Sequence, residues 1–435
     1  MSQATAKLLI KAGKEHWIEK REESIDVKGK GSQETYFLKG FTARDSSSGK
    51  TGSSTYGGTA DTSVLESYCE SKEPQLSVQG SKVSIAAVPD RTARLIDWNT
   101  EVLSRRIRAV IEQREAQIDP DFKDAELDRD VVAVLRDYVQ GIACMYRDNP
   151  FHNFAHASHV TLSIEKMLSR VQQNSDFSSG YTNNICSDPL AQFAVVLAAM
   201  VHDVDHQGVS NDTLVKEKDP IAIKYHGKSP AENHSLCIAW EVLMQAEYSK
   251  LVKTVCGNDQ KEVARLKQLL TSAVMATDVF DKDLKDTRNY RWAQVFGNQD
   301  VTKDEAHQID NLKAQIVLEH LIQASDVAHT MQHWHVYVKW NQRLFEEMSN
   351  AFHSGHLAKN PAEFWYQGEL GFLNHYVIPL AKKLKECKVF GVSCDEFLNY
   401  AEANLQEWEI KGKGIVAEFI EQYQAKTAAG NISRK

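Results

Sequence analysis

The sequence predicts an all-α fold for most of its 435 residues, and three observations support this prediction. From about Pro89 to residue 425, apolar side chains recur at the spacing of amphipathic helices. Pro189 opens a dense apolar run, as prolines do in the first turn of a helix. Strand patterns are almost absent from the same part of the sequence. We therefore expect a compact domain of many helices layered around a common core.

Seven long segments carry the helical pattern. In the first of them, apolar residues stand at positions 95, 98, 102, 103, 107, 110 and 111, close to a period of 3.6. The third is the most apolar, which favours the centre of the core. In chain order the predicted helical segments are 94–114, 129–147, 188–204, 231–248, 263–280, 311–352 and 370–387.

Composition argues against several classes of function. The formal net charge of -8 does not favour a nucleic acid as partner. The longest apolar run, residues 191–201, is shorter than the roughly 20 residues that a membrane-spanning helix needs, so we expect no membrane segment in this chain. The seven cysteines include no C-x-x-C pair, which favours reduced thiols. We expect a cytoplasmic location, or the cytoplasmic side of a membrane if the parent protein is tethered upstream.

The N-terminal part of the chain differs from the rest in composition. Residues 41–63 are rich in Ser, Gly and Thr, which is typical of a flexible linker, and we extend this linker to residue 89. Upstream of it, Ile25–Val27 and Thr35–Leu38 have strand character, and the Gly-Lys-Gly between them suits a hairpin turn. We predict four parts of the chain: an N-terminal segment 1–40, a linker 41–89, a helical domain 90–425 and a tail 426–435.

Histidines and carboxylates cluster at three places in the helical part. FHNFAHASHV (151–160) places His152 and His156 four residues apart. HDVDHQG (202–208) repeats this spacing, with two aspartates between the histidines. Residues four apart are neighbours on one face of a helix. Asp326 lies in a third helical segment, and ends of apolar helices such as these can converge on one pocket.

Such a pocket suits metal-assisted hydrolysis. Two histidines and two aspartates offer a mixed nitrogen and oxygen ligand set that fits zinc with positions left for water. An aspartate can also bridge to a harder ion such as magnesium. Two ions about 3.5–4 Å apart can hold a bridging hydroxide and neutralise the charge of a phosphate. A histidine that is not a ligand can then protonate the leaving oxygen.

These residues carry a family resemblance. The sequence strongly resembles the class I 3′,5′-cyclic nucleotide phosphodiesterases, with five motifs in the family's order. FHNFAHA begins at Phe151, where tyrosine is usual, and the pattern H-D-x-D-H-x-G-x-x-N is complete at 202–211. Glu-Asn-His at 232–234, Ala-Thr-Asp at 276–278 and the late Asp326 follow. The resemblance implies an all-α, HD-type phosphodiesterase domain over about residues 90 to 425.

The resemblance also implies a role for each matching residue. The first metal ion, zinc, would be held by four residues: His156, His202, Asp203 and Asp326. Asp203 would also reach the second ion, magnesium or manganese, whose other ligands are mainly waters. His152 would be the general acid that protonates the O3′ leaving group, and Glu232 would orient it. The residues expected around the ions and the phosphate are His206, His234 and Thr277.

The residues expected to bind the nucleotide are Glu369, Phe372, Leu344 and Asp326. The family has a glutamine that faces the purine, and Glu369 takes its place here. An ionised glutamate only accepts hydrogen bonds, and guanine offers two donors along one edge where adenine offers one donor and one acceptor. We therefore expect a preference for cyclic GMP, unless burial keeps Glu369 protonated. His329 replaces the family's asparagine, which weakens inferences about how the base is read.

Residues 5–40 resemble the last hairpin of a class III adenylate or guanylate cyclase domain, in the pattern V-K-G-K-G-x-x-x-T-Y-F-L. Lys28 matches a lysine that contacts the triphosphate of the cyclase substrate. A whole cyclase domain needs far more residues than this chain has there, so the segment would be a remnant, and the parent protein could be fused to a cyclase upstream. A chance lysine-glycine hairpin is the alternative interpretation.

Two other functions stay open at the level of sequence. One is an HD-type hydrolase of other nucleotides, which would share the His-Asp pair but does not explain the five ordered motifs. The other is a catalytically weak cyclic nucleotide sensor, because Glu369 and His329 depart from the family's base-site pattern. The expected ligand is in either case a small nucleotide.

Overall fold

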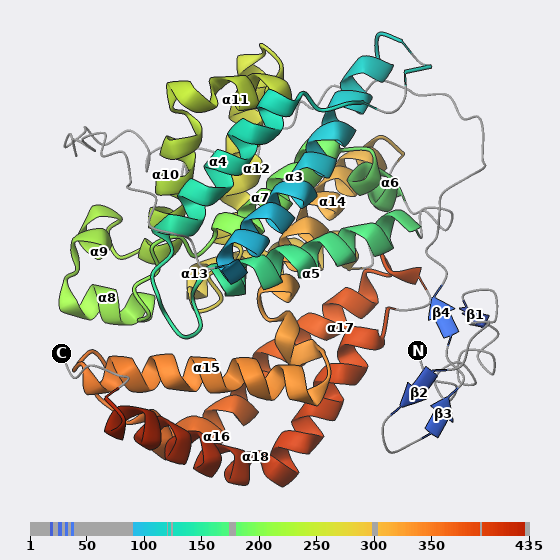
Figure 1. Ribbon diagram of the computed structural model, residues 1–435. Coiled ribbons are helices and arrows are strands. Elements are labelled where there is room, and N and C mark those ends of the chain that lie inside the picture. Colours follow the sequence, from blue (N-terminus) through green and yellow to red (C-terminus); the bar gives the residue numbers. More distant parts are fainter. Residues whose placement is uncertain are drawn as a thin grey trace. The chain divides into compact units, whose positions relative to one another are not determined.

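The computed structural model describes short strands between residues 18 and 38, and residues 90–430 apart from 120, 123–124, 174–179, 298–302 and 392–393. The chain divides into two compact units, Met1–Asp61 and Thr62–Lys435, and we describe each by itself. The boundary falls inside the predicted linker 41–89, which lies outside the described residues. The described part of the second unit is helical, which confirms the predicted all-α fold (Figure 1).

The first unit contains two antiparallel strand pairs. Strand β2 (Ile25–Val27) pairs with β3 (Gly31–Gln33), and β1 (Ile18–Lys20) pairs with β4 (Tyr36–Leu38). Ile25–Val27 is a strand, as predicted, and a partner follows it closely in the chain. The expected pairing with the Tyr-Phe-Leu segment is wrong, because that segment pairs with β1 instead.

The second unit is a succession of helices. In chain order these are α3 (Asp90–Ala116), α4 (Arg129–Met145), α5 (Phe154–Gln173), α6 (Gly180–Cys186), α7 (Pro189–Val201), α8 (Asn211–Glu217), α9 (Pro220–Lys224), α10 (Pro230–Leu243), η3 (Ala246–Tyr248), α11 (Ser249–Cys256), α12 (Gln260–Met275), α13 (Lys282–Phe296), α14 (Lys303–Asp326), η4 (Ala328–Met331), α15 (Trp334–His353), α16 (Pro361–Phe372), η5 (Leu373–Val377), α17 (Ile378–Glu386) and α18 (Glu396–Ala428). The helices η3 and η4 are 3₁₀ helices and η5 is a π-helix.

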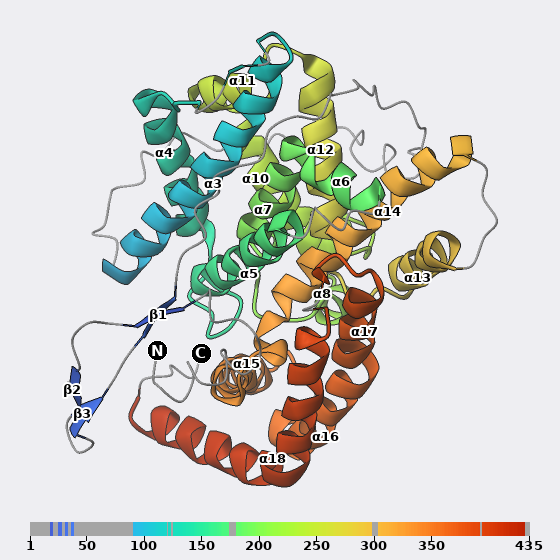
Figure 2. The ribbon, with the colours of Figure 1, turned by 90° about the vertical axis from the view of Figure 1, so that its right-hand side faces the viewer.

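Helix α7 is the centre of the core. All of its residues after Pro189 are buried, and α3, α5 and α12 pack around it (Figures 1 and 2). The Asp188 side chain caps its first turn by accepting a hydrogen bond from the backbone N–H of Ala191. Helix α7 ends at Val201, so His202 and Asp203 lie directly after the end of this buried helix.

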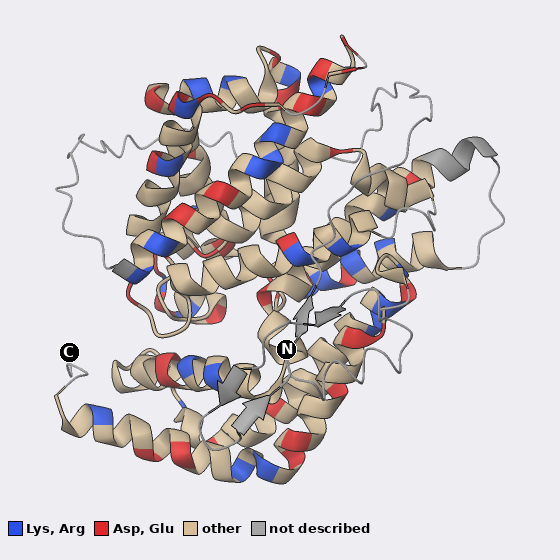
Figure 3. Cartoon of the chain, turned by 45° about the vertical axis from the view of Figure 1, so that its right-hand side comes forward, with Lys and Arg blue, Asp and Glu red and all other residues tan. Residues whose placement is uncertain are grey.

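Among the described helices, no single one is long and apolar enough to cross a membrane. Helices α6 and α7 would pass that test only as a pair, and the chain bends by 71° between them. Figure 3 shows acidic and basic residues interspersed over the helices on the face that it draws, in keeping with the modest net charge.

The C-terminal helices form a second layer of the unit. Helix α18 packs against α15, α16 and α17, and these helices lie together in the lower part of Figure 1. The predicted segment 311–352 is broken in the structure, because α14 ends at Asp326 and α15 begins at Trp334. This break places Asp326 at a helix end. The last helix runs to Ala428, slightly past the predicted domain boundary at residue 425.

Candidate active site

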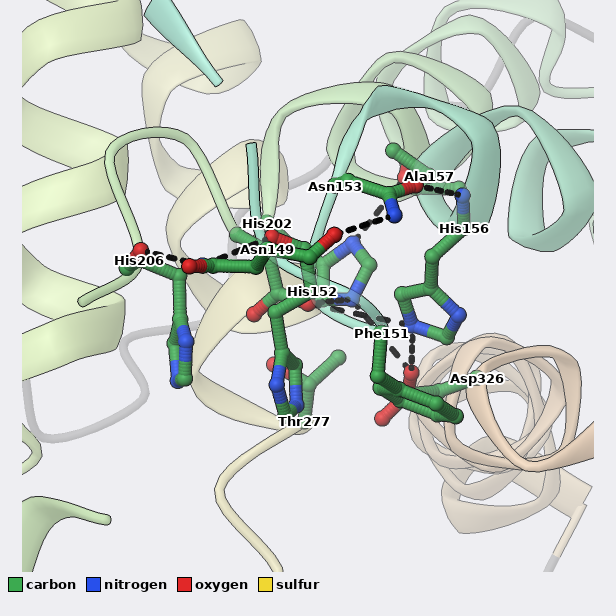
Figure 4. Close-up of polar contacts among 12 residues, drawn as sticks. Asn149, Phe151, His152, Asn153, His156, Ala157, His202, His206, Thr277 and Asp326 are labelled. Carbon is green, nitrogen blue, oxygen red and sulfur yellow. Dashed lines mark hydrogen bonds and ion pairs between the residues drawn. The ribbon is translucent and has the colours of Figure 1, made fainter. Parts of the chain in front are cut away.

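The first histidine pair straddles the start of helix α5. Asn153 precedes the helix, and its Oδ1 accepts hydrogen bonds from the backbone N–H groups of Ala155 (2.9 Å) and His156 (3.1 Å). His156 is therefore in the first turn, whereas His152 lies in the loop before it. The idea that both share one helix face is wrong, because His152 precedes α5, although the two ring centroids still lie 6.0 Å apart (Figure 4).

The second histidine pair follows α7 rather than lying on it. His202 stands directly after the last helical residue, and Asp205 has a left-handed backbone, with a φ of 60°. The turn carries His206 away from His202. The Nδ1 of His202 is 3.0 Å from the carbonyl oxygen of Ala199, so Nδ1 donates and Nε2 is the nitrogen that faces Asp203 and Asp326.

The four predicted metal ligands lie close together, and Figure 4 labels three of them, His156, His202 and Asp326. Asp326 Oδ1 lies 3.0 Å from His156 Nε2 and 3.3 Å from His202 Nε2. Asp203 Oδ2 lies 3.1 Å from His202 Nε2 and 3.7 Å from His156 Nε2. His156, His202 and Asp326 each offer a ligand atom, and these three atoms all lie within 4.8 Å of one another, the spacing that one metal ion requires. Segments around α5, α7 and α14 thus supply a single N₂O₂ group.

The electrostatics of this group call for a cation. Burial raises the pKa of Asp326, but hydrogen bonds from the two histidines outweigh it and hold that pKa well below its usual range. Burial lowers the pKa of His202, but the two carboxylates reverse the effect and hold it well above the ordinary value. His202 Nε2 is buried and lies near both carboxylates, at 3.1 and 3.3 Å, but the geometry of neither contact is that of a regular hydrogen bond. Two half-buried carboxylates facing two buried imidazole rings fit a divalent ion such as zinc.

A second group stands beside the first. His152 Nδ1 is hydrogen-bonded to Glu347 Oε1, and Glu347 Oε2 accepts from the backbone N–H groups of Phe151 (2.8 Å) and His152 (2.9 Å). The ring of His206 stacks on that of His152, with centroids 4.0 Å apart. Three hydrogen bonds therefore hold the Glu347 carboxylate and orient the His152 ring, which leaves its Nε2 available for proton transfer.

The pKa values in this second group are driven apart. Burial disfavours a charged His152, but the carboxylates of Glu347 and Asp203 outweigh it and raise the pKa of His152 to about 9. Burial and then the charge of His152 lower the pKa of His206 to about 4. Burial raises the pKa of Glu347, but His152 outweighs it and holds that pKa at about 2. The neighbouring carboxylates thus favour the protonated form of His152, which is the form that a general acid requires.

The residues predicted to bind a base lie on α15 and α16. Glu369 is buried, and its Oε2 accepts a hydrogen bond of 2.7 Å from the hydroxyl of Tyr337. Burial raises the pKa of Glu369 to about 7, although hydrogen bonds from Tyr337 and Asn341 oppose the shift. Phe372 and Leu344 are half-buried and pack against the core. Glu369 is therefore poised between the ionised and the protonated form near neutral pH.

Residues 151–390, more than half of the chain, match the family described as 3′5′-cyclic nucleotide phosphodiesterase. The chain belongs to this family. The match confirms the resemblance that rested on the five motifs, and it covers both histidine groups and Glu369. It does not extend to the cyclase-like residues 1–40, for which the resemblance remains a prediction.

Individual relatives span the same activity class. A probable 3′,5′-cyclic-AMP phosphodiesterase, pde-4, of Caenorhabditis elegans is 29% identical over 231 residues, 52% of this chain and 31% of its own length. The cGMP-specific 3′,5′-cGMP phosphodiesterase 3 of Dictyostelium discoideum is 24% identical over 290 residues, 64% of this chain and 56% of its own. This chain thus matches only part of the length of these phosphodiesterases.

A solved structure agrees with the fold. The phosphodiesterase domain of the RhoPDE fusion protein from the choanoflagellate Salpingoeca rosetta superposes with a TM-score of 0.57 at 22% identity. The likeness covers 78% of this chain and 94% of that one. It supports the all-α phosphodiesterase fold for the helical unit.

One predicted contact of the phosphodiesterase site is wrong. Glu232 was expected to orient His152, but Glu347 occupies that position. Glu232 Oε2 instead accepts a hydrogen bond of 2.8 Å from Asn211, and burial together with the Asp278 carboxylate raises the pKa of Glu232 to about 8. Glu347 follows another glutamate in the sequence, and only the fold shows which of the two faces the site.

The remaining residues singled out from the sequence make contacts of their own outside the proposed metal group. His234 Nε2 lies 2.9 Å from Asp205 Oδ2, and Arg147 donates to the other oxygen of that carboxylate. The hydroxyl of Thr277 donates to the Val274 carbonyl oxygen (2.7 Å), which leaves its oxygen lone pairs free. His329 is buried against the ring of Phe151, and its Nδ1 has no hydrogen-bond partner among the described residues.

Proposed function

We propose that this chain is a 3′,5′-cyclic nucleotide phosphodiesterase that hydrolyses cyclic AMP, cyclic GMP or both to the 5′-monophosphate. The observation that carries the proposal is the convergence of His156, His202 and Asp326, with Asp203 beside them, next to a histidine held by Glu347. Family membership supplies the reaction class. The alternative HD-type hydrolase and the weak sensor explain the first group of residues but not the second.

The residues of the first group would hold the metal ions. His156, His202 and Asp326 would bind one ion, for which we propose zinc, and Asp203 would reach both this ion and a second, magnesium or manganese. The ions would supply a water that is nucleophilic at neutral pH and would offset the charge of the phosphate. His206 and His234 are proposed to support the ligands and the bound waters from outside.

His152 would deliver the proton that completes the reaction. When water adds to phosphorus, the bond from phosphorus to O3′ breaks and O3′ needs a proton. Nε2 of His152 would donate it, since Nδ1 is engaged by Glu347. The Glu347 carboxylate would stabilise the imidazolium before transfer and preserve the ring's orientation afterwards.

The nucleotide would lie between the metal group and Glu369. Phe372 and Leu344 are proposed as the two walls that enclose the purine. Ionised Glu369 would accept hydrogen bonds from N1 and N2 of guanine, whereas protonated Glu369 could donate to N1 of adenine. Because the pKa of Glu369 is about 7, we propose that both cyclic nucleotides are substrates at neutral pH.

The location is a proposal as well. The six cysteines within the described residues are free, as expected for a reducing compartment, and we propose the cytoplasm. Fusion of the parent protein to a nucleotide cyclase, suggested by residues 5–40, would place synthesis and destruction of one messenger in the same protein.

The test is substitution of the proposed acid. His152→Ala should lower kcat on both cyclic nucleotides by roughly 10²–10⁴-fold and leave zinc content unchanged, since His152 is not a ligand. His356→Ala, at an exposed histidine paired with Glu217, is the matched control and should behave as wild type. Full activity in His152→Ala would refute the mechanism. A wild-type protein that binds cyclic nucleotides without hydrolysing them, or that cleaves only nucleoside triphosphates, would favour the alternatives.

A further inference from the structure

The hydroxyl of Tyr376 is a buried polar group that has no role in the proposed metal binding or proton transfer. Its oxygen is buried and has no hydrogen-bond partner among the described residues. Nearly all buried hydroxyls in proteins are hydrogen-bonded, so each exception calls for an explanation. A substrate atom that reaches the hydroxyl only when bound is one such explanation.

A π-helical turn of the backbone allows the ring of Tyr376 to stack on the ring of Phe372. Pro379 cannot donate a backbone hydrogen bond, and in a regular α-helix its ring would clash with the carbonyl of His375. The chain instead forms the π-helix η5, in which the N–H of Ile378 donates to the Leu373 carbonyl oxygen, five residues earlier. The Tyr376 ring stacks on that of Phe372, with centroids 5.3 Å apart and planes 23° from parallel.

The surroundings of the hydroxyl belong to the active site. Helix η5 packs against η4, the segment that directly follows the metal ligand Asp326. The charges of Asp326 and of Arg288 both act on the Tyr376 phenol. Arg288 makes no hydrogen bond to it among the described residues, and Nη2 of Arg288 donates instead to the Asp278 carbonyl oxygen at 2.8 Å. The Tyr376 ring is therefore stacked on the proposed purine wall, and its hydroxyl is within the electrostatic influence of Asp326 in the proposed metal group.

We propose that Tyr376 is a substrate-binding residue whose hydroxyl donates a hydrogen bond to a ring nitrogen of the purine, N7 or N3. This inference rests on the proposed phosphodiesterase function. Glu369 faces the edge where adenine and guanine differ, whereas N7 and N3 are acceptors in both. Tyr376 would thus recognise a purine as such and leave the choice between the two purines to Glu369.

The test is Tyr376→Phe, which keeps the ring and its stacking on Phe372 and removes only the hydroxyl. We expect KM for cyclic AMP and cyclic GMP to rise by about tenfold, the effect of one lost hydrogen bond, with kcat within about twofold of wild type. Zinc content should not change. The increase should disappear on either the 7-deaza or the 3-deaza analogue, because that analogue lacks the acceptor.

The matched control is Tyr366→Phe, whose hydroxyl donates at the exposed surface to the Glu409 carbonyl oxygen and should not affect KM. Wild-type KM values in Tyr376→Phe would overturn the inference while the proposed function stands. An increase that persists on both analogues, or a loss of zinc, would also overturn it by showing an indirect effect. A wild-type protein inactive on both cyclic nucleotides would overturn the proposed function, and the inference with it.

Discussion

The two ends of the active site differ in how their polar groups are held. At the metal end, each carboxylate faces at least one histidine, and Glu347 alone takes part in three hydrogen bonds. At the base end, Glu369 is held by neutral neighbours, and the oxygen of Tyr376 and Nδ1 of His329 have no partner among the described residues. The carboxylates of the metal end are thus held by their histidine contacts and hydrogen bonds, whereas Glu369 has only neutral partners. The atoms without a partner among the described residues, which include His202 Nε2 at the metal end, are those that a metal ion or a substrate would satisfy.

The largest expected effect breaks the metal end. Asp326→Ala removes the carboxylate that lies between both histidine ligands, so the protein should lose zinc and its activity should fall below that of His152→Ala. Zinc content and kcat, measured on the same preparation, check this. Asp212→Ala, which removes an exposed carboxylate paired with Lys216, is the control. An Asp326→Ala protein that retains zinc would disprove the assigned ligand set.

A smaller effect tests how the acid is held. Glu347→Gln removes the charge that raises the pKa of His152, so that pKa should fall and kcat should drop by about 10–100-fold. The basic limb of the kcat profile should move to lower pH, because His152 would lose its proton earlier. Glu346→Gln changes the neighbouring glutamate, which pairs with Lys426, and should have little effect. If Glu232→Gln shifted the profile and Glu347→Gln did not, the sequence-based assignment would be restored.

The smallest effect concerns the base end and depends on pH. Burial raises the pKa of Glu369 to about 7, so this carboxyl is protonated below neutrality and ionised above it. The ratio of kcat/KM for cyclic GMP to that for cyclic AMP should therefore rise by roughly tenfold between pH 6 and pH 8, since the ionised form suits guanine. Glu369→Gln should abolish this dependence. A ratio that varies with pH equally in both proteins would remove Glu369 from the explanation.

Much of the metal end could be predicted from sequence. His156, His202, Asp203 and Asp326 were assigned from short motifs, and the structure brings all four together. The expected position of these clusters at helix ends is confirmed, but the shared helix faces are wrong, because His152 precedes α5 and the pair His202 and His206 follows α7. The repeated four-residue spacing was informative as a motif and not as helical geometry.

The amino-acid sequence by itself determined the helical fold of the domain, its most buried helix and the set of residues that meet in the proposed metal group, because periodicity and short motifs are local properties of the chain. Only the tertiary structure decided that Glu347 and not Glu232 holds His152, that Glu369 is buried enough to shift its pKa, and that the Tyr376 hydroxyl is unsatisfied. Each of these depends on contacts between residues far apart in the chain and on exclusion of water, which no local pattern encodes.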